Sequence, residues 1–184
     1  MKKILFFFLI FFLFFSNNLH SEEKVINILK EGGNIVFIRH AYAPGNGDPK
    51  DFNLSDCLTQ RNLSIDGINQ SKKIGFFFEK NEIKIDQVLS SQWCRCKDTA
   101  KFAFKEYKTF NALNSFYDSR FAHNKSKQIK DLKKMIKNWD RKKNLIFITH
   151  YVVIYEILNI PVSSGEIVVS DINFNILGNI EINN

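Results

Sequence analysis

The sequence is poor in cysteine and has no apolar run long enough to cross a bilayer. Its three cysteines, among 184 residues, are Cys57, Cys94 and Cys96. A Cys-x-Cys pair with one distant cysteine lacks the spacing of a zinc site, so we expect no metal. The apolar run Ile4–Phe15 has 12 residues, whereas a helix needs about 20 to span a membrane.

Two further features are absent. The sequence has no internal repeat and no boundary that would indicate a second domain, and its length fits one domain with a hydrophobic core. Basic residues interleaved with aromatic ones indicate nucleic-acid binding, and the sequence lacks such a stretch. We therefore expect one globular domain and no nucleic-acid partner.

The first 21 residues have the layout of a secretory signal peptide. Two lysines precede the apolar run, and a polar stretch follows it. We expect cleavage near Ser21–Glu22, although Leu19 is larger than the residue usually found three places before the cut. The alternative is an uncleaved membrane anchor. The expected product is a periplasmic or secreted domain over residues 22–184.

That domain is basic. The full sequence has a formal net charge of +7, and removing residues 1–21 takes away two lysines and no acids, so +7 becomes +5. Many of the remaining lysines lie in residues 125–143, where apolar residues at helical spacing predict an amphipathic helix with a solvated basic face. A basic surface also favours anionic substrates or membrane surfaces.

Strand and helix patterns alternate along the chain. Continuous apolar runs predict buried strands, and apolar residues at helical spacing predict helices. The expected strands are 34–39, 87–90, 144–149, 166–170 and 173–182. The expected helices are 23–30, 64–80, 93–104, 124–139 and 151–158. This alternation predicts an α/β fold, with a mostly parallel central sheet flanked by helices on both faces. The long polar loop 41–62 is typical of a functional segment.

Polar side chains follow three of the expected strands. Arg39 and His40 end the first strand. The second strand leads through Ser91 into a helix that carries Arg95, and His150 follows the third strand, at 144–149. Because the carboxyl ends of parallel strands meet at one edge, we expect these side chains to lie together. An imidazole there can act as a nucleophile, and a guanidinium can hold an anion.

Four segments resemble, in order, the motifs of the histidine phosphatase superfamily, which includes phosphoglycerate mutases and acid phosphatases. Phe37–Ala41 resembles the Arg-His-Gly signature, and Leu63–Gln70 resembles the Leu-Thr-x-x-Gly-x-x-Gln helix start. Val88–Ala100 matches the Ser-Ser-x-x-x-Arg-x-x-x-Thr-Ala segment, and Ile148–His150 matches the second histidine. The loop resembles that of small exported bacterial members, a group that includes a phosphatase of lipopolysaccharide-core heptose phosphate.

The resemblance implies a role for each polar residue at the strand ends. His40 is expected to be the nucleophile and to become phosphohistidine, while Arg39, Arg95 and His150 bind the phosphoryl oxygens. Fixed cations can stabilise the charge of a phosphoryl group in transfer, so no metal or other cofactor is expected.

Two loop residues, Gln60 and Arg61, are expected to extend the pocket and bind substrate. For Arg61 a plain surface position is the alternative, since arginine is mostly exposed.

Three departures from the family pattern limit the prediction. Ala41 replaces the usual glycine, which is tolerable if its φ is negative. Ala43 stands where phytase-like members have a further arginine, and Tyr151 stands where acid phosphatases carry an aspartate as proton donor. The general acid therefore stays open, with three candidates: Asp118, Glu166 and Asp48.

The cysteines flank this chemistry. In an exported protein one disulfide is expected. We expect Cys57 to pair with Cys94 or Cys96, with Cys94 preferred, because the bond would pin the loop to the start of a helix. The closed loop of about 40 residues would stabilise the fold by roughly 3–4 kcal/mol in the chain-entropy model.

Several functions remain possible. The first is an exported, metal-independent phosphomonoesterase acting on a phosphorylated small molecule or envelope glycan, with a lipopolysaccharide-core sugar phosphate the first guess. The second is a catalytically weak module that binds phosphorylated sugars or lipids. A cytosolic phosphoprotein phosphatase or a glycolytic mutase conflicts with the leader sequence. Three loop acids, Asp48, Asp51 and Asp56, argue against a polyanionic substrate because each would repel phosphate.

Overall fold

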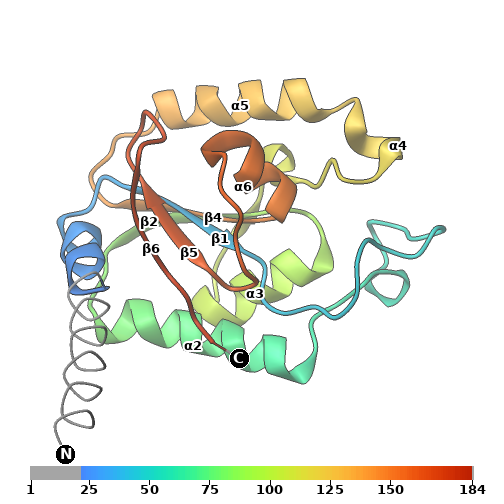
Figure 1. Cartoon of the computed structure of the whole chain (residues 1–184), viewed down its shortest axis with the longest axis horizontal. Helices are drawn as coiled ribbons and strands as arrows, with labels where there is room; N and C mark the ends of the chain where they lie inside the picture. The colour runs from blue at the N-terminus through green and yellow to red at the C-terminus, as the bar shows by residue number, and fades with distance from the viewer. Residues whose placement is uncertain (1–21, 184) are drawn as a thin grey trace, which may run out of the picture.

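The computed structural model describes residues 22–183 and arranges them around a six-stranded sheet (Figure 1). The strands are β1 (Ile35–Arg39), β2 (Ile85–Ser90), β3 (Lys108–Thr109), β4 (Asn144–Thr149), β5 (Ile167–Ser170) and β6 (Ile176–Ile180). The α-helices are α2 (Ile65–Lys80), α3 (Cys94–Phe104), α4 (Ser119–Ala122), α5 (Lys125–Lys137) and α6 (Tyr151–Leu158), and residues 22–31 are helical too. Two short 3-10 helices are η1 (Cys57–Thr59) and η2 (Asn111–Leu113). The expected signal peptide lies outside the described residues.

The strands follow the order β3-β2-β4-β1-β5-β6. The first four in this order are parallel, whereas β5 runs antiparallel to β1 and β6 antiparallel to β5. Parallel neighbours need a long crossover connection, which the intervening helices supply, whereas an antiparallel pair can be joined by a short turn. The prediction of an α/β fold with a mostly parallel sheet is confirmed.

The central strands β1 and β4 are buried on both faces. In β1, Val36 and Ile38 pack on the side of α2 and α3, while Ile35 and Phe37 pack on the side of α5 and α6. All four are fully buried. Figure 1 shows the sheet between these two layers of helices. Burial on both faces explains why the strands are continuous apolar runs rather than alternating ones.

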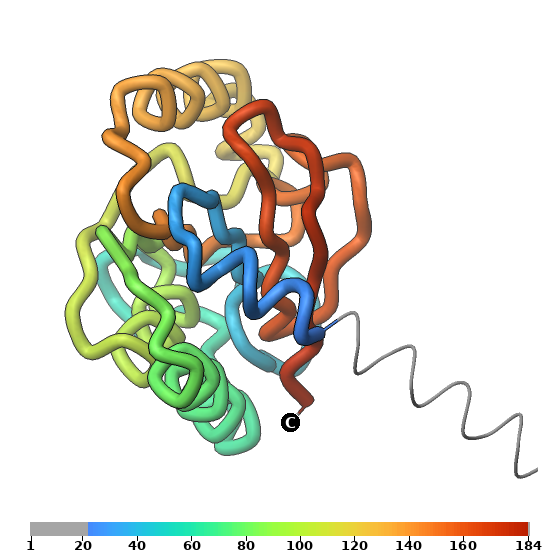
Figure 2. The backbone as a smooth tube through the Cα atoms, turned by 90° about the vertical axis from the view of Figure 1, so that its left-hand side faces the viewer, coloured from blue at the N-terminus to red at the C-terminus, as the bar shows by residue number. Residues whose placement is uncertain are grey.

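An asparagine pair joins the amino ends of β1 and β4. The Nδ2 of Asn34 donates to Asn144 Oδ1 at 3.0 Å and to the carbonyl of Ile28 at 2.8 Å. The Nδ2 of Asn144 donates to the carbonyls of Leu29 and Lys84 at 2.6 and 3.0 Å. These bonds fix the helix of residues 22–31 to the sheet. Figure 2 shows that helix crossing beside the C-terminal strands.

Some short elements were not predicted from the sequence. β3 has two residues and α4 has four, which is too few to produce a hydrophobic period. The last strand begins at Ile176 rather than at residue 173, because Asp171 accepts hydrogen bonds from the backbone of Asn173 and Asn175 and forms a turn there. Within residues 22–183, no helix is long and apolar enough to cross a membrane.

Candidate active site

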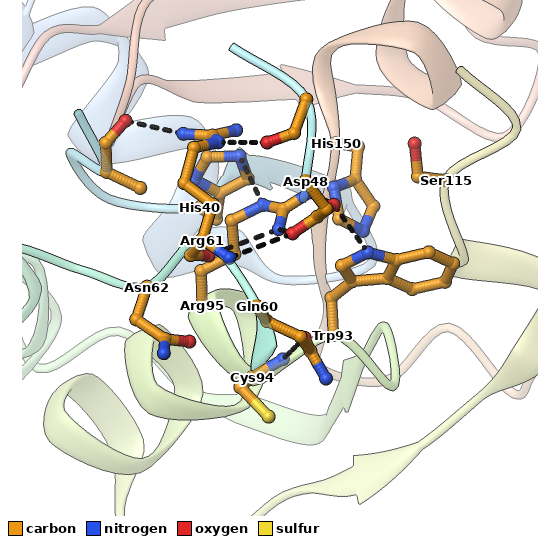
Figure 3. Close-up of polar contacts among 12 residues, drawn as sticks. His40, Asp48, Gln60, Arg61, Asn62, Trp93, Cys94, Arg95, Ser115 and His150 are labelled. Carbon is orange, nitrogen blue, oxygen red and sulfur yellow. Dashed lines mark hydrogen bonds and ion pairs between the residues drawn. The ribbon is translucent and has the colours of Figure 1, made fainter. Parts of the chain in front are cut away.

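A pocket of about 380 Å³ opens at the carboxyl ends of β1 and β4. Its lining includes the four residues expected to meet there, namely Arg39, His40, Arg95 and His150. Figure 3 shows the side chains of His40, Arg95 and His150, which come from different elements. The ring centroids of the two histidines lie 5.6 Å apart, and both side chains are almost fully buried. The parallel register of β1 and β4, which pairs Arg39 with Thr149, brings the two strand ends to the same level.

Two contacts fix the tautomer of His40. Its Nδ1 lies 2.9 Å from the carbonyl oxygen of Ala41, and a carbonyl only accepts, so Nδ1 carries the proton. The Nε of Arg95 lies 3.3 Å from His40 Nε2, and a guanidinium only donates, so Nε2 carries a lone pair. An unprotonated Nε2 is the form of imidazole that can act as a nucleophile.

The backbone after His40 is held in place by residues from the other motifs. The hydroxyl of Thr99 accepts a bond from the Ala41 N–H at 3.0 Å, and Gln70 Oε1 accepts one from the Tyr42 N–H at 2.9 Å. A methyl at Gly67 would lie 2.0 Å from the Tyr42 carbonyl oxygen, so only glycine permits this approach of α2. The Leu63–Gln70 motif thus positions the site without entering it.

Ala41 itself fits where the family pattern has glycine. It is not among the non-glycine residues with positive φ, so its methyl group introduces no backbone strain.

His150 is oriented by the segment that follows β2. Its Nε2 lies 2.8 Å from the hydroxyl of Ser91. The ring also meets the indole of Trp93 edge-on, with ring centroids 5.3 Å apart. Both residues belong to the third motif, which therefore supplies the contacts of the second histidine as well as Arg95.

Arg95 forms a buried, bidentate ion pair with Asp48. Its Nη1 donates to Asp48 Oδ1 at 2.8 Å, and its Nη2 donates to Oδ2 at 3.1 Å. The two side chains are 4% and 7% exposed. Asp48 also accepts bonds from the indole N–H of Trp93 and from the backbone N–H of Arg61, both at 3.0 Å. The sequence suggested Asp48 as a proton donor but not this pairing.

Arg39 has an unsatisfied donor. Its Nη1 donates to the carbonyl of Val162 at 2.8 Å, but its buried Nε has no partner among the described residues. Leaving a buried donor unpaired costs about 1–3 kcal/mol. An oxyanion in the pocket is a suitable partner for this guanidinium.

The charges in the pocket keep the histidines neutral. Burial lowers the pKa of His40 well below its ordinary value, and the positive charge of Arg95 lowers it further. The pKa of His150 is lowered for the same two reasons, in the same order. For Asp48, burial alone would raise the pKa, but the hydrogen bonds and charge of Arg95 outweigh it, so the pKa falls below its ordinary value. Asp48 is therefore a carboxylate at neutral pH.

The two loop residues expected to bind substrate hold the loop together instead. Arg61 lines the pocket, but its guanidinium donates to the carbonyls of Gly47 and Ala43. Gln60, expected to bind substrate, is not among the residues that line the pocket. Its Nε2 donates to the carbonyls of Asn53 and Leu54 at 3.1 and 3.0 Å, and its Oε1 accepts from the Cys94 N–H at 3.0 Å.

A disulfide anchors the same loop. It joins Cys57 to Cys94, the preferred pairing, with Cα atoms 5.7 Å apart and a sequence separation of 37. Cys96 stays a free, buried thiol. Burial raises the pKa of Cys96 to about 12, so it is an unreactive thiol at neutral pH.

The candidate acids lie in three different environments. Glu166 does not line the pocket, and its Oε1 and Oε2 already accept bonds from Asn179 Nδ2 and the Ser163 N–H. Asp118 lies on the pocket wall, caps α4 and pairs with Arg120, whose hydrogen bonds lower the pKa of Asp118. Asp48 is the candidate nearest to Arg95.

The aromatic wall of the pocket was not predicted. Four aromatic side chains take part in the lining: Phe52, Trp93, Tyr117 and Tyr151. They come from separate loops and from the start of α6, so no pattern in the sequence marks them as a group. Among residues 22–183, no cluster of His, Cys, Asp and Glu side chains has the arrangement of a metal site.

Solved structures provide the comparison. The Thermus thermophilus phosphoglycerate mutase superposes with a TM-score of 0.56 at 14% identity, covering 82% of this chain and 99% of that one. The protein histidine phosphatase SixA, in complex with tungstate, gives 0.51 at 15% identity, covering 78% and 92%. This chain has the histidine phosphatase fold. A candidate alpha-ribazole-5'-P phosphatase of Escherichia coli gives 0.57 at 15% identity, covering 82% and 96%.

The resemblance found in the sequence is therefore confirmed at the level of the fold. No protein-family model matches the sequence, and no curated protein matches it either. The three solved structures differ in the activities that they are named for, so the shared fold leaves the substrate open.

Proposed function

We propose that this protein is an exported phosphomonoesterase that transfers a phosphoryl group to His40 and then to water. The observation that carries the proposal is the tautomer of His40, whose Nε2 lone pair faces Arg95 in the pocket. Attack by Nε2 on phosphorus breaks the bond to the leaving oxygen, which takes a proton from water, and forms phosphohistidine. Water then breaks the P–N bond, releases inorganic phosphate and restores the neutral ring.

The neighbouring cations suit this chemistry. A phosphoryl group in transfer spreads negative charge over its oxygens, and preorganised donors stabilise that charge. Arg39 has a buried N–H without a partner among the described residues, and Arg95 lies against the attacking atom. We assign both, together with His150, to binding the phosphoryl oxygens. No step in this scheme requires a metal ion or cofactor.

The substrate proposed is a phosphate monoester on a neutral, sugar-like body, with an envelope sugar phosphate the first choice. Aromatic rings form much of the pocket wall, and such rings present large apolar faces to a ligand. Asp48 and Asp118 in the lining would repel a second phosphate group. Export rests on the leader-like residues 1–21, and the disulfide fits an oxidising compartment.

A first experiment tests the catalytic scheme. The protein without residues 1–21 is expected to hydrolyse para-nitrophenyl phosphate in the presence of EDTA, and quenching during turnover should trap an acid-labile, base-stable phosphoenzyme. His40→Ala should remove both signals. His123→Ala, which changes an exposed histidine outside the pocket, is the matched control. Phosphoenzyme that persists in His40→Ala, or activity that requires added metal, would contradict the proposal.

The second candidate function is a binding module for phosphorylated sugars, and it predicts no hydrolysis in these assays. It predicts saturable binding of sugar phosphates and no turnover of any of them. A panel of sugar phosphates, nucleotides, phytate and phosphopeptides distinguishes the two functions and ranks the substrates. The highest kcat/KM on phytate or a phosphopeptide would contradict the substrate proposed here and leave the chemistry of His40 intact.

A further inference from the structure

All but one of the N–H groups of Arg95 already have a partner within the chain. A guanidinium has five N–H groups. The Nε–H donates to His40, Nη1 donates to Asp48 and to the Arg61 carbonyl, and one Nη2–H donates to Asp48. One N–H is left for a ligand, whereas a phosphoryl group is normally held by two parallel bonds from arginine.

Asp48 holds the two nitrogens that a bidentate oxyanion would use. Its oxygens lie 2.8 and 3.1 Å from Nη1 and Nη2 of Arg95. Figure 3 shows the carboxylate between Arg95 and Trp93, among the residues that line the pocket. A carboxylate and a phosphoryl group offer arginine the same pair of acceptor oxygens, so they compete for one position.

We propose that Asp48 and the phosphoryl group of the substrate exchange on Arg95, so that Asp48 closes the anion site in the free protein and the substrate displaces it. This inference rests on the proposed function. It makes the Asp48 carboxylate a competitor of the phosphoryl group for Arg95. It also implies that the segment around Asp48 moves when substrate binds.

Exchange of one anion for another avoids the cost of opening the pair. Breaking a buried ion pair by removing one partner is strongly unfavourable, because the other charge is left uncompensated. Arg95 and Asp48 are 4% and 7% exposed, so Arg95 alone would carry that cost. An incoming phosphate supplies the missing charge, while Asp48 moves into water, where a carboxylate is well solvated.

The segment around Asp48 has few backbone hydrogen bonds. Gly45 and Gly47 precede Asp48 at φ values of 85° and 65°, and residues 44–46 are exposed. Within the described part of the chain, the backbone of residues 44–48 accepts a single hydrogen bond, at Gly47 from Arg61. The disulfide and Gln60 anchor the far end of the loop. This end is held by the bonds of the Asp48 carboxylate and by the Arg61 guanidinium, so release of Asp48 from Arg95 removes a main anchor of the segment.

Affinity for inorganic phosphate, measured by calorimetry at pH 7, tests the exchange. Asp48→Asn keeps the shape of the side chain and removes the charge, so it is expected to bind phosphate about tenfold or more tightly than the unmodified protein, a change equivalent to about 1.4 kcal/mol or more. Asp51→Asn makes the same charge change in the same loop at an exposed position and should leave the affinity within about twofold. Equal or weaker binding by Asp48→Asn would overturn the exchange and make Asp48 a fixed support for Arg95.

A second measurement works on the native side chain. The indole N–H of Trp93 donates to Asp48, so its resonance should move to higher field as phosphate saturates the site, and Trp139→Phe identifies which of the two indole signals belongs to Trp93. A signal that does not move at saturating phosphate would overturn the exchange even if Asp48→Asn fails to fold. Absence of phosphate binding by every variant would contradict the proposed function as well, whereas binding without displacement contradicts the exchange alone.

Discussion

Polar residues lie at both the amino and the carboxyl ends of β1 and β4. Their hydrogen-bonding groups are satisfied at the amino ends and incompletely satisfied at the carboxyl ends. At the amino ends, Asn34 and Asn144 bond each other and nearby carbonyls, and neither has a buried side-chain atom without a partner. At the carboxyl ends, His40 keeps a lone pair, and Arg39 has a buried donor with no partner within residues 22–183.

The difference separates stability from function. A buried hydrogen-bond network in which every group has a partner stabilises the fold, because removing one member leaves other buried groups without a hydrogen bond. An incompletely satisfied group weakens the fold and is retained where a ligand completes it. Substitutions at the two ends should therefore have opposite consequences, and the following experiments test that contrast.

The largest effect is expected for His40→Ala. Loss of the nucleophile should lower kcat/KM for an aryl phosphate by about 10⁴-fold or more. The melting temperature at pH 8 should change little, because the imidazole is neutral in both the folded and the unfolded protein at that pH. Steady-state kinetics and thermal melts, run beside His123→Ala, check both expectations. A large loss of stability would remove the contrast between the two strand ends.

Loss of the disulfide should come next in size. Cys57→Ser opens a loop closed over 37 positions and should lower the free energy of unfolding by roughly 3–4 kcal/mol in the chain-entropy model. Urea denaturation with and without reductant measures the effect. Thiol titration of the unreduced protein should find one thiol after denaturation and none before it, because Cys96 is buried. Three thiols after denaturation would show that the bond does not form.

Asn144→Ala should damage the fold and spare the chemistry. It removes one acceptor of Asn34 Nδ2 and the side-chain donor to the carbonyls of Leu29 and Lys84, at a cost of about 1–3 kcal/mol. Urea denaturation measures the loss, and kcat/KM per folded molecule should be unchanged. Asn173→Ala, at an exposed turn position, is the control. A selective loss of kcat at full stability would mean that the amino ends influence the site.

Near neutral pH, the smallest effect is a dependence of stability on pH that arises from the two buried histidines at the carboxyl ends. His40 and His150 have folded pKa values well below the ordinary value of 6.5, so the unfolded state binds their protons first as the pH falls. Stability is then fully present above about pH 6.5 and is lost progressively below it, at up to about 1.4 kcal/mol per pH unit for each histidine.

His40→Asn should flatten this slope by one proton, whereas Asn173→Ala should leave it unchanged. Denaturation midpoints between pH 5 and pH 8 provide the measurement. An unchanged slope in His40→Asn would indicate that His40 titrates normally in the folded protein.

Much of the site could be predicted because its residues follow buried strands. The apolar runs at 34–39 and 144–149 indicate strands, and parallel strands must bring their carboxyl ends to one edge. That argument placed Arg39, His40 and His150 in one pocket. Asn34 and Asn144 likewise begin these two strands. The sequence predicted them only as strand residues, because a single asparagine does not show which hydrogen bonds its side chain will form.

Loop residues were harder to assign. Gln60 and Arg61 stand beside Cys57 and have side chains suited to binding a phosphate ester, yet both bond mainly to loop backbone. Glu166 follows the same pattern, with both oxygens used by neighbouring donors. A side chain's partners depend on the path of the loop, which has no hydrophobic period that would reveal it.

The sequence by itself determined the α/β architecture, the meeting of two histidines and two arginines, and a disulfide at Cys57, because these follow from periodicity, from strand order and from the few cysteines available. Only the tertiary structure decided which nitrogen of His40 carries the proton and that Asp48 occupies Arg95. Those two properties depend on distances of about 3 Å between groups as far apart in sequence as Asp48 and Arg95. Hydrogen bonds of that length are set by the packing of the whole fold and not by local sequence.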